Sequence, residues 1–435
     1  MRRGGRYLLL LAAFAVVPQT AIAAHSTLGW ARARVIDGAP AGAPAPASFD
    51  LDSVACASPD SCVAVGSYIA TLPSHEQAGA SGSTLPVIVA RSRRTWLAPH
   101  GIALPANALR GKGQAAALEA VACPALGSCV AIGSYVARSG APQEMVLSQV
   151  RGAWTPARQL ALSSPSTSVL LSSLACSTAS SCVAVGSSQE SAQGAAGSSS
   201  SHPVIASESG GSWGPAVQVA LPAGVSGAQN ATFSSVACPA AQSCTAVGYY
   251  ELEAVGFSPP AERAIVAGGS AGVWGAASAI GLASKLRGAS GEQLKSVACT
   301  APGACEAVGS YEDSHGDDHP IGLGESSGVW GPASAIAAPA NAGGGASTSL
   351  EAVACPVHGS CVAVGQYDAR GGAVAPMAVS GAGSRWGRAS EIASPLGAGA
   401  GPGLLEHLLS LACPGPRLCL AVGDEIAAST LSGRT

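Results

Sequence analysis

The segment Ser53-Val-Ala-Cys-Ala-Ser-Pro-Asp-Ser-Cys-Val-Ala-Val-Gly-Ser-Tyr68 places two cysteines six positions apart among small and β-branched residues. Nearly the same sequence recurs at Glu351-Ala-Val-Ala-Cys-Pro-Val-His-Gly-Ser-Cys-Val-Ala-Val-Gly-Gln-Tyr367. Successive copies begin 53 to 67 residues apart, a period typical of supersecondary units that bury their faces only by stacking on one another. The C-x5-C spacing occurs seven times and accounts for all 14 cysteines: Cys56/Cys62, Cys123/Cys129, Cys176/Cys182, Cys238/Cys244, Cys299/Cys305, Cys355/Cys361 and Cys413/Cys419.

Tryptophan is the second marker of the repeat. One tryptophan follows each cysteine pair except the last, and one precedes the first: Trp30, Trp96, Trp154, Trp213, Trp274, Trp330 and Trp386. Each unit then contains four short strands: Leu-x-Ser-Val-Ala-Cys, Cys-Val-Ala-Val-Gly, a third such as Pro86-Val-Ile-Val-Ala90, and a fourth that begins at tryptophan. Four strands repeated seven times predict an all-β, seven-bladed β-propeller with four-stranded blades.

The two ends of the chain carry incomplete units. Residues 30–36 read as a lone fourth strand, and residues 426–435, after the last cysteine pair, read as a third strand without its tryptophan. We expect the N-terminal strand to join the C-terminal blade. This closure of the ring would remove an exposed sheet edge, which is otherwise prone to aggregation.

The cysteine spacing predicts one disulfide in the hairpin of each blade. Two cysteines that flank a five-residue turn can face each other across neighbouring strands, within the Cβ separation that a disulfide needs. Closing so short a loop contributes about 2 kcal/mol to stability in the chain-entropy estimate. The competing interpretation is metal binding, but zinc sites use a closer cysteine spacing and a second ligand pair.

The N-terminus predicts an export signal over residues 1–23. A basic start (Arg2, Arg3 and Arg6), an apolar run and the motif Ala21-Ile22-Ala23 have the layout of a cleavable signal peptide. We therefore expect a secreted protein with a single propeller domain over residues 24–435, without a membrane span and monomeric. Its 25 acidic residues would then outnumber the remaining 19 basic ones, which argues against a nucleic-acid partner.

The loops of one predicted face vary in length and content, whereas the cysteine and tryptophan turns of the other face are uniform. Variable loops on a uniform scaffold are where ligand sites usually lie. At the edge of the variable face, tyrosine recurs at one repeat position, which predicts a ligand-binding rim of flat, hydroxyl-bearing side chains. The alternative is a packing residue whose hydroxyl caps a loop. The five tyrosines are Tyr68, Tyr135, Tyr250, Tyr311 and Tyr367.

One variable loop concentrates charge in a chain that has little. Residues 311–320 read Tyr-Glu-Asp-Ser-His-Gly-Asp-Asp-His-Pro, and Asp313, Asp317 and Asp318 are candidate ligands for Ca²⁺. The spacing matches no standard calcium loop, so a solvated acidic loop is the alternative interpretation.

The turn before each tryptophan, as in Ser209-Gly-Gly-Ser-Trp213 and Ser326-Ser-Gly-Val-Trp330, resembles the Asp-box turn of sialidase-like and BNR-repeat propellers, although the Asp is missing in every copy. The cysteine-paired unit is similar, across nearly the whole mature chain, to repeats of secreted bacterial propellers. The resemblance implies the fold. A sialidase would bring an arginine triad, a tyrosine nucleophile and an acid, and no motif here matches them.

Catalytic motifs are otherwise lacking. The sequence contains no G-x-S-x-G elbow, phosphate loop or H-E-x-x-H motif. We therefore expect a non-catalytic module that binds carbohydrate or protein through its variable face, and we assign no catalytic residue and no cofactor beyond the candidate Ca²⁺. The alternative is a glycan-active hydrolase or lyase, whose paired carboxylates could come from different blades. A redox propeller with quinone or copper is a third interpretation.

Overall fold

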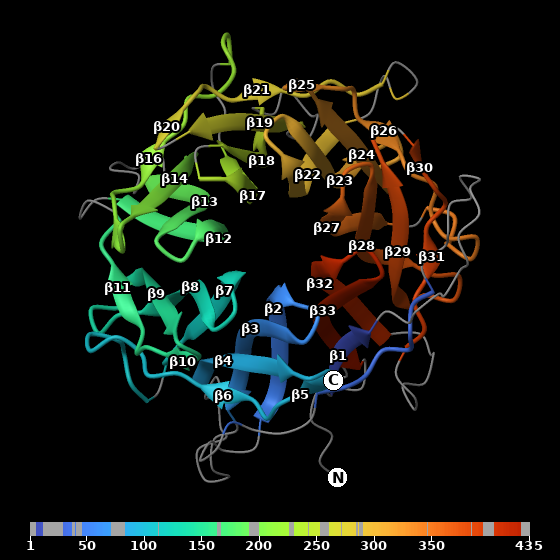
Figure 1. The fold of residues 1–435 in the computed structure, drawn as a ribbon. Coiled ribbons are helices and arrows are strands. Elements are labelled where there is room, and N and C mark those ends of the chain that lie inside the picture. The colour runs from blue at the N-terminus through green and yellow to red at the C-terminus, as the bar shows by residue number, and fades with distance from the viewer. Residues whose placement is uncertain are drawn as a thin grey trace, which may run out of the picture.

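The structure is a computed structural model, and it describes residues 6–11, 29–36, 40, 46–70, 83–111, 113–162, 167–190, 200–225, 230–241, 243–252, 261–270, 272–283, 286, 290–345, 347–383, 385–394 and 404–427. Within these ranges the protein is built of β-strands, and no α-helix occurs. The sheets stand around a common centre, each with its first strand innermost (Figure 1).

The first two strands of each repeat form a long hairpin. The innermost strands are β2 (Pro46–Ser58), β7 (Ala116–Ala125), β12 (Thr167–Thr178), β17 (Ala231–Ala240), β22 (Ser290–Ala301), β27 (Thr348–Val357) and β32 (Leu404–Gly415). The second strands are β3 (Ser61–Ala70), β8 (Ser128–Val136), β13 (Ser181–Glu190), β18 (Ser243–Glu251), β23 (Ala304–Glu312), β28 (Ser360–Asp368) and β33 (Leu418–Ala427).

The third strands follow outward from the centre. They are β4 (Ser83–Ser92), β9 (Pro142–Val150), β14 (Ser201–Ser209), β19 (Glu262–Ser270), β24 (Asp318–Ser326) and β29 (Val374–Ala382). Neighbouring strands within a repeat pair antiparallel. Six sheets result, because one parallel bridge between Val374 and Leu405 joins the last two repeats into a single eight-stranded sheet.

The predicted fourth strand is divided into two short pieces, both of which pair with the third strand. The first piece ends at tryptophan: β5 (Thr95–Trp96), β10 (Ala153–Trp154), β15 (Ser212–Trp213), β20 (Val273–Trp274), β25 (Val329–Trp330) and β30 (Arg385–Trp386). The second piece follows a few residues later: β6 (His100–Gly101), β11 (Arg158–Leu160), β16 (Val217–Gln218), β21 (Ser278–Ala279), β26 (Ser334–Ala335) and β31 (Ser390–Glu391).

Each innermost strand contains a β-bulge that explains the glycine of the Cys-Val-Ala-Val-Gly strand. In the first repeat the register shifts between Leu51 and Ser53, opposite Gly66. A Cβ atom on Gly66 would lie 1.9 Å from the carbonyl oxygen of Asp50, so only glycine fits. The equivalent distance is 1.9 to 2.0 Å at all seven positions: Gly66, Gly133, Gly186, Gly248, Gly309, Gly365 and Gly423.

The serine of the Leu-x-Ser-Val-Ala-Cys strand connects neighbouring repeats. Its hydroxyl oxygen accepts a hydrogen bond from a backbone N–H on the innermost strand of the next repeat. The two repeats without this bond have Ala120 and Ala352 in place of the serine. The five bonds run from Val121 N to Ser53 Oγ, Val236 N to Ser173 Oγ, Val297 N to Ser235 Oγ, Val353 N to Ser296 Oγ and Val54 N to Ser410 Oγ, at 3.0 to 3.2 Å.

The hydrophobic core lies in layers between successive repeats. In one layer, Val65 and Ile88 of the first repeat pack with Leu118 and Met145 of the second. Trp154 covers the same layer from its outer side. The alanine- and valine-rich strands therefore bury their faces mainly against their neighbours, as the repeat pattern predicts.

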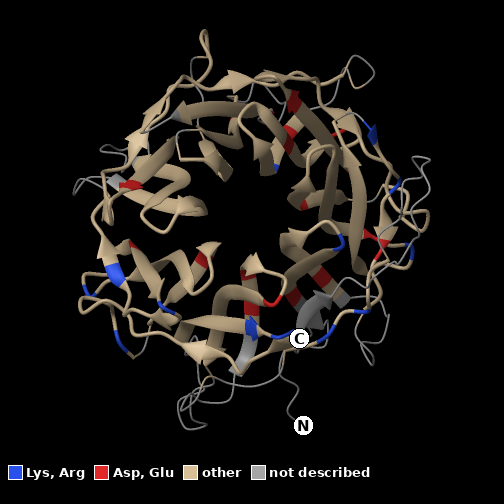
Figure 2. Cartoon of the chain, in the orientation of Figure 1, with Lys and Arg blue, Asp and Glu red and all other residues tan. Residues whose placement is uncertain are grey.

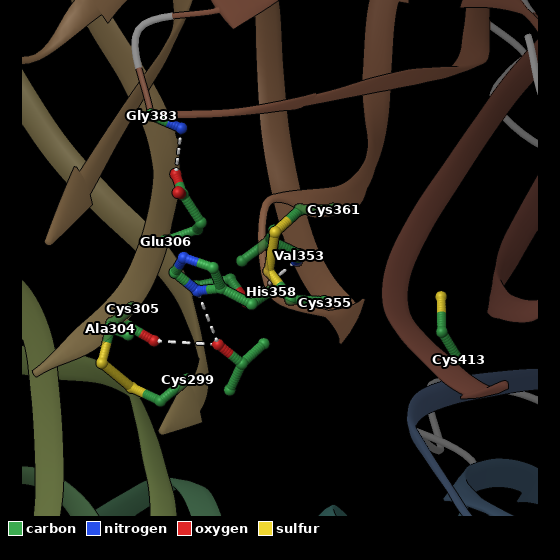
Figure 3. Close-up of a disulfide and its surroundings, with 12 residues drawn as sticks. Cys299, Ala304, Cys305, Glu306, Val353, Cys355, His358, Cys361, Gly383 and Cys413 are labelled. Carbon is green, nitrogen blue, oxygen red and sulfur yellow. Dashed lines mark hydrogen bonds between the residues drawn. A yellow bond between two sulfur atoms is a disulfide. The ribbon is translucent and has the colours of Figure 1, made fainter. Parts of the chain in front are cut away.

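All seven predicted disulfides are confirmed, with Cα atoms 4.0 to 4.1 Å apart across each hairpin. They are Cys56–Cys62, Cys123–Cys129, Cys176–Cys182, Cys238–Cys244, Cys299–Cys305, Cys355–Cys361 and Cys413–Cys419. Figure 3 shows the Cys299–Cys305 pair and its surroundings. Beside it, the Thr300 hydroxyl lies 3.4 Å from Nδ1 of His358 in the cysteine turn of the next repeat. Glu306 likewise reaches the following repeat, where it accepts a 2.6 Å hydrogen bond from the Gly383 amide.

The two cysteines of each pair differ in burial, which the spacing did not predict. The first cysteine is half-buried on the innermost strand, whereas the second lies between two strands of its own sheet and against the preceding repeat. The second cysteines are only 1% to 8% exposed: Cys62, Cys129, Cys182, Cys244, Cys305, Cys361 and Cys419. These residues are therefore part of the core and not of a surface site, and the disulfides hold the hairpins together from within.

The N-terminal segment lies against the C-terminal repeats. Trp30 and Ala33 pack in the layer between the last two repeats. The Ala33 amide donates to the Ala393 carbonyl at 3.1 Å. The same contact recurs between other successive repeats, as from Ala389 to Ala337 and from Ala333 to Gly281. Residues 30–36 thus lie against the last two repeats, and they contain only isolated bridges, at Trp30 and Arg34, and no strand.

The predicted third strand over residues 426–435 needs a correction. Ile426 and Ala427 end the second strand β33, where they pair with β32. The place beside β33 is taken by β1 (Arg6–Leu11), within the segment predicted as a signal peptide. The rest of both segments, residues 1–5, 12–23 and 428–435, lies outside the described residues.

Candidate functional site

The five tyrosines predicted as a ligand-binding rim lie in the layers between repeats. Their exposed fractions range from 0% to 9%: Tyr68, Tyr135, Tyr250, Tyr311 and Tyr367. The hydroxyls of Tyr135 and Tyr367 donate to Asn107 and Asn341, at 2.9 and 3.0 Å. Burial raises the pKa of Tyr367 to about 12. These contacts are those of the alternative interpretation, a packing residue, and ligand contact by the tyrosines stays a prediction.

The candidate calcium loop is held together by its own hydrogen bonds. Asp313 accepts from the backbone amides of His315 and Asp317, and its other oxygen lies 3.0 Å from His319 Nε2. The hydrogen bond with His319, followed by that with the His315 amide, lowers the pKa of Asp313. Asp318 accepts from the Ser347 hydroxyl. No three His, Cys, Asp or Glu side chains among the described residues could hold a metal ion, and calcium binding stays a prediction.

Three of the predicted variable loops are only partly described. Their residues 71–82, 191–199 and 253–260 lie outside the described ranges. The site on the innermost strands was not predicted from the sequence.

The bulges place one extra residue on each innermost strand. These residues are Asp52, Glu119, Ser172, Ser234, Lys295, Glu351 and Leu409. A bulge turns its side chain out of the regular alternation, and such positions often lie next to functional sites. Figure 2 shows acidic residues near the centre of the molecule, at the inner ends of the sheets that contain β2 and β7.

Four carboxylates from three repeats interact at this place. They are Asp50 and Asp52 on β2, Glu119 on β7 and Asp424 on β33, and we call them the central carboxylates. Burial, followed by the charges of Asp50, Glu119 and Asp424, raises the pKa of Asp52 to about 7. Burial and the charge of Asp424 also raise the pKa of Asp50. The group therefore holds a proton that isolated carboxylates would lose well below neutral pH.

Two polar neighbours position the central carboxylates. His407 Nδ1 lies 3.2 Å from Asp424 Oδ1, and this hydrogen bond is the main cause of the raised pKa of His407. The Ser134 hydroxyl donates to Glu119 Oε1 at 2.8 Å. Glu119 and Asp424 are therefore held by hydrogen bonds, and the charge of each raises the pKa of Asp52.

A fifth carboxylate is buried next to Glu119. Glu144 is 3% exposed, and neither of its oxygens makes a hydrogen bond of ordinary geometry. Burial and the charge of Glu119 hold its pKa well above its usual value, although the nearby Leu171 amide lowers it. An uncompensated carboxylate costs stability, so its presence inside the protein requires a reason. The matching positions of the other described third strands hold Pro86, Pro203, Ala264, Pro320 and Pro376.

The inner strand of the fifth repeat carries a different set of charged and polar residues. Lys295, the extra residue of the β22 bulge, places its ammonium 6.0 Å from the centre of the Tyr249 ring. Glu262 on β19 accepts a hydrogen bond from Gln293, which lies on β22 with Lys295. The inner strands thus carry an acidic side and a mixed side. Ionised carboxylates accept hydrogen bonds, and a protonated Asp52 can donate one.

The sequence held one usable signal for this site. The variable position x of the Leu-x-Ser-Val-Ala-Cys strand holds a charged residue in four repeats: Asp52, Glu119, Lys295 and Glu351. The other positions of this motif hold apolar or small residues. A charge repeated in a core strand is unusual unless it is paired or serves a function. The bulge that gives this letter its special position could be recognised only in the structure.

Comparison with known proteins assigns no family. No protein-family model matches the sequence, and no curated protein matches it. Among solved structures, the Hadza microbial sialidase Hz136 is similar at 9% identity and a TM-score of 0.38, over 68% of this chain and 63% of that one. The Trypanosoma rangeli sialidase in complex with sialic acid gives 9% and 0.39, over 97% and 60% of the two chains. The fucose-specific lectin from Aleuria aurantia gives 12% and 0.33, over 80% and 99%.

These values are too low to assign the chain to a family, and it spans less than two thirds of the length of either sialidase. The resemblance of its turns to the Asp-box stays a prediction. No helix among the described residues is long and apolar enough to cross a bilayer.

Proposed function

We propose that residues 24–435 form a secreted, monomeric, seven-bladed β-propeller, closed into a ring, that binds carbohydrate at the central carboxylates without cleaving it. Secretion is supported by the seven disulfides, which persist in oxidising compartments. Ring closure is supported by two contacts between the ends of the chain, from Val54 to Ser410 and from Ala33 to Ala393.

The observation that carries the binding site is the coupling of Asp50, Asp52, Glu119 and Asp424 across three repeats. A sugar hydroxyl both donates and accepts hydrogen bonds. A carboxylate group that shares a proton near neutral pH offers both functions at once. The buried Glu144 beside Glu119, whose pKa is held well above its usual value, adds a further carboxyl group at the edge of the same site.

The test exposes the purified mature protein to a panel of soluble and insoluble polysaccharides, and scores retention and new chain ends in the same samples. We expect retention on at least one polysaccharide without new ends, and about tenfold weaker retention for Asp52→Asn, because a neutral hydrogen bond replaces a stronger, charge-assisted one. Asp318→Asn, in the acidic loop, is the control and should bind as the wild type does. Equal retention of the two variants would contradict a binding site at the central carboxylates.

A glycan-active hydrolase or lyase is the second candidate, and one observation favours it. A carboxyl with a pKa of about 7, such as Asp52, can act as a general acid at neutral pH while a neighbour stays ionised. New chain ends that disappear in Asp52→Asn would replace the binding function with this one. Absence of both retention and new ends would redirect the search to protein ligands.

A further inference from the structure

A second concave site lies on the outer part of the molecule, between the fourth and fifth repeats. It is an open groove of about 590 Å³, within the size range of small-molecule sites. The fourth repeat contributes Val266, Gly268 and Ser278, and the fifth contributes Glu325, Gly328 and Trp330. The groove is far along the sheets from the innermost strands, so it is distinct from the central carboxylates.

The same place between the second and third repeats is occupied by an arginine. Arg158 stands four residues after Trp154, and its Nη2 donates to the Gly211 carbonyl oxygen of the third repeat at 3.3 Å. Its charge also lowers the pKa of Glu208 against the effect of burial. A guanidinium of the chain itself therefore binds a turn carbonyl across this junction and acts electrostatically on the nearby Glu208.

The groove presents the same partners without the arginine. Glu325 corresponds to Glu208, since each pairs with the tryptophan of its own turn. Gly328 corresponds to Gly211, since each lies two residues before that tryptophan. At the position of Arg158, four residues after Trp274, the chain has Ser278.

Glu325 lacks the charge compensation of its counterpart. Among the described residues neither glutamate forms an ion pair, and each has a buried Oε2 without a hydrogen-bond partner, but only Glu208 has a guanidinium acting on it. Burial raises the pKa of Glu325, with no opposing positive charge. Gly268, which faces the groove where the second repeat has Ser148, leaves additional room.

We infer that this groove binds a guanidinium group, carried by an arginine-like small molecule or by an arginine of a peptide. Glu325 is the counter-ion, the Gly328 carbonyl accepts a hydrogen bond as Gly211 does from Arg158, and the Trp330 ring offers a stacking face. Guanidinium suits this set because it pairs with carboxylates and stacks on aromatic rings at the same time.

The first test is calorimetric titration of the mature protein with N-acetyl-arginine amide and with N-acetyl-citrulline amide, which has nearly the same shape but no charge. We expect saturable binding of the arginine compound and at least tenfold weaker binding of the citrulline compound. Equal affinities, or no saturable binding of either, would overturn the inference. A Gly-Arg-Gly peptide that binds more tightly than the amide would identify a peptide as the source, and equal or weaker binding would identify a small molecule.

The second test uses matched variants. Glu325→Gln should weaken binding of the arginine compound at least tenfold, and Ser278→Arg should abolish it by filling the groove as Arg158 fills its own junction. Glu208→Gln is the control and should leave the affinity unchanged. Melting temperatures near the wild-type value establish that the variants fold. A loss of affinity in Glu208→Gln as large as in Glu325→Gln would also overturn the inference, whatever the result at the central carboxylates.

Discussion

At the scale of single residues, the glycine that ends each Cys-Val-Ala-Val-Gly strand shows how closely the repeat is fixed by backbone geometry. Its missing side chain makes room for the carbonyl oxygen before a β-bulge. The bulge in turn displaces the side chain of one extra residue, which is Asp52 in the first repeat and Glu119 in the second. The scaffold glycine and the candidate site therefore have one common structural cause.

Replacement of one such glycine should be severely destabilising. In Gly365→Ala the new Cβ would meet the Ser349 carbonyl oxygen at 2.0 Å, so backbone must move. We expect the free energy of unfolding to fall by about 3 kcal/mol or more, measured by urea denaturation. Gly387→Ala is the control in the same repeat, because its Cβ has its nearest contact at 3.5 Å. A similar, small effect of both substitutions would argue against the bulge.

The raised pKa of Asp52 predicts a pH-dependent stability. Asp52 ionises near pH 7 in the folded chain and near its usual 3.8 in the unfolded chain. Between these values the folded chain holds the extra proton, so this group makes stability fall as the pH rises from about 4 to about 7, with no further loss above. Asp52→Asn should therefore stabilise the protein more at pH 8 than at pH 5, by about 2 kcal/mol.

Thermal and urea unfolding of both chains at the two pH values measure this difference. An Asp52→Asn effect that is the same at pH 5 and pH 8 would show that Asp52 ionises normally. The central carboxylates would then lack the shared proton on which their proposed dual hydrogen bonding depends.

The sequence predicted some of these residues and missed others for physical reasons. The cysteine pairs were predictable because a disulfide across a hairpin depends on local spacing alone. The burial of the second cysteine was not, because it depends on the strands and repeats that cover it. The tyrosines recur at one repeat position, but which side of the blade they occupy likewise depends on strand register and on packing between repeats. Asp52, Glu119 and Asp424 are distant in sequence, so their charges interact only after the repeats have packed together.

At the scale of elements, the innermost strands hold the repeats together through the serine hydroxyl. Ser235→Ala removes the acceptor of the Val297 amide, which the apolar surroundings cannot replace. We expect the free energy of unfolding to fall by about 1 kcal/mol in urea denaturation. Ser234→Ala changes the adjacent bulge residue and should have less than half that effect. The reverse order would contradict the role of the serine.

The outer strand is the element that the sequence predicted least well. A continuous fourth strand was expected after each tryptophan, but the structure has two short pieces. Pro156, Pro215 and Pro332 stand two residues after their tryptophans and have no N–H to donate to the third strand. In these three repeats the proline positions could have predicted the interruption.

At the scale of the whole molecule, the incomplete units at the two ends of the chain were informative. The solitary Trp30 predicted that the N-terminal segment lies beside the last repeat, and Trp30 and Ala33 pack in the layer between the last two repeats. The third strand of that repeat was assigned wrongly, because residues 426–427 extend the second strand. Alternation of small residues marks a strand but does not show where one strand ends and the next begins.

The measurement that tests ring closure most directly is amide hydrogen exchange of the mature protein, read by NMR at Ala33. In a closed ring its N–H is bound to the Ala393 carbonyl, just as the Ala389 N–H is bound to Ala337. We predict that Ala33 exchanges as slowly as Ala389, with protection close to that of global unfolding. Exchange of Ala33 at the rate of a free loop, while Ala389 stays protected, would contradict the closed propeller.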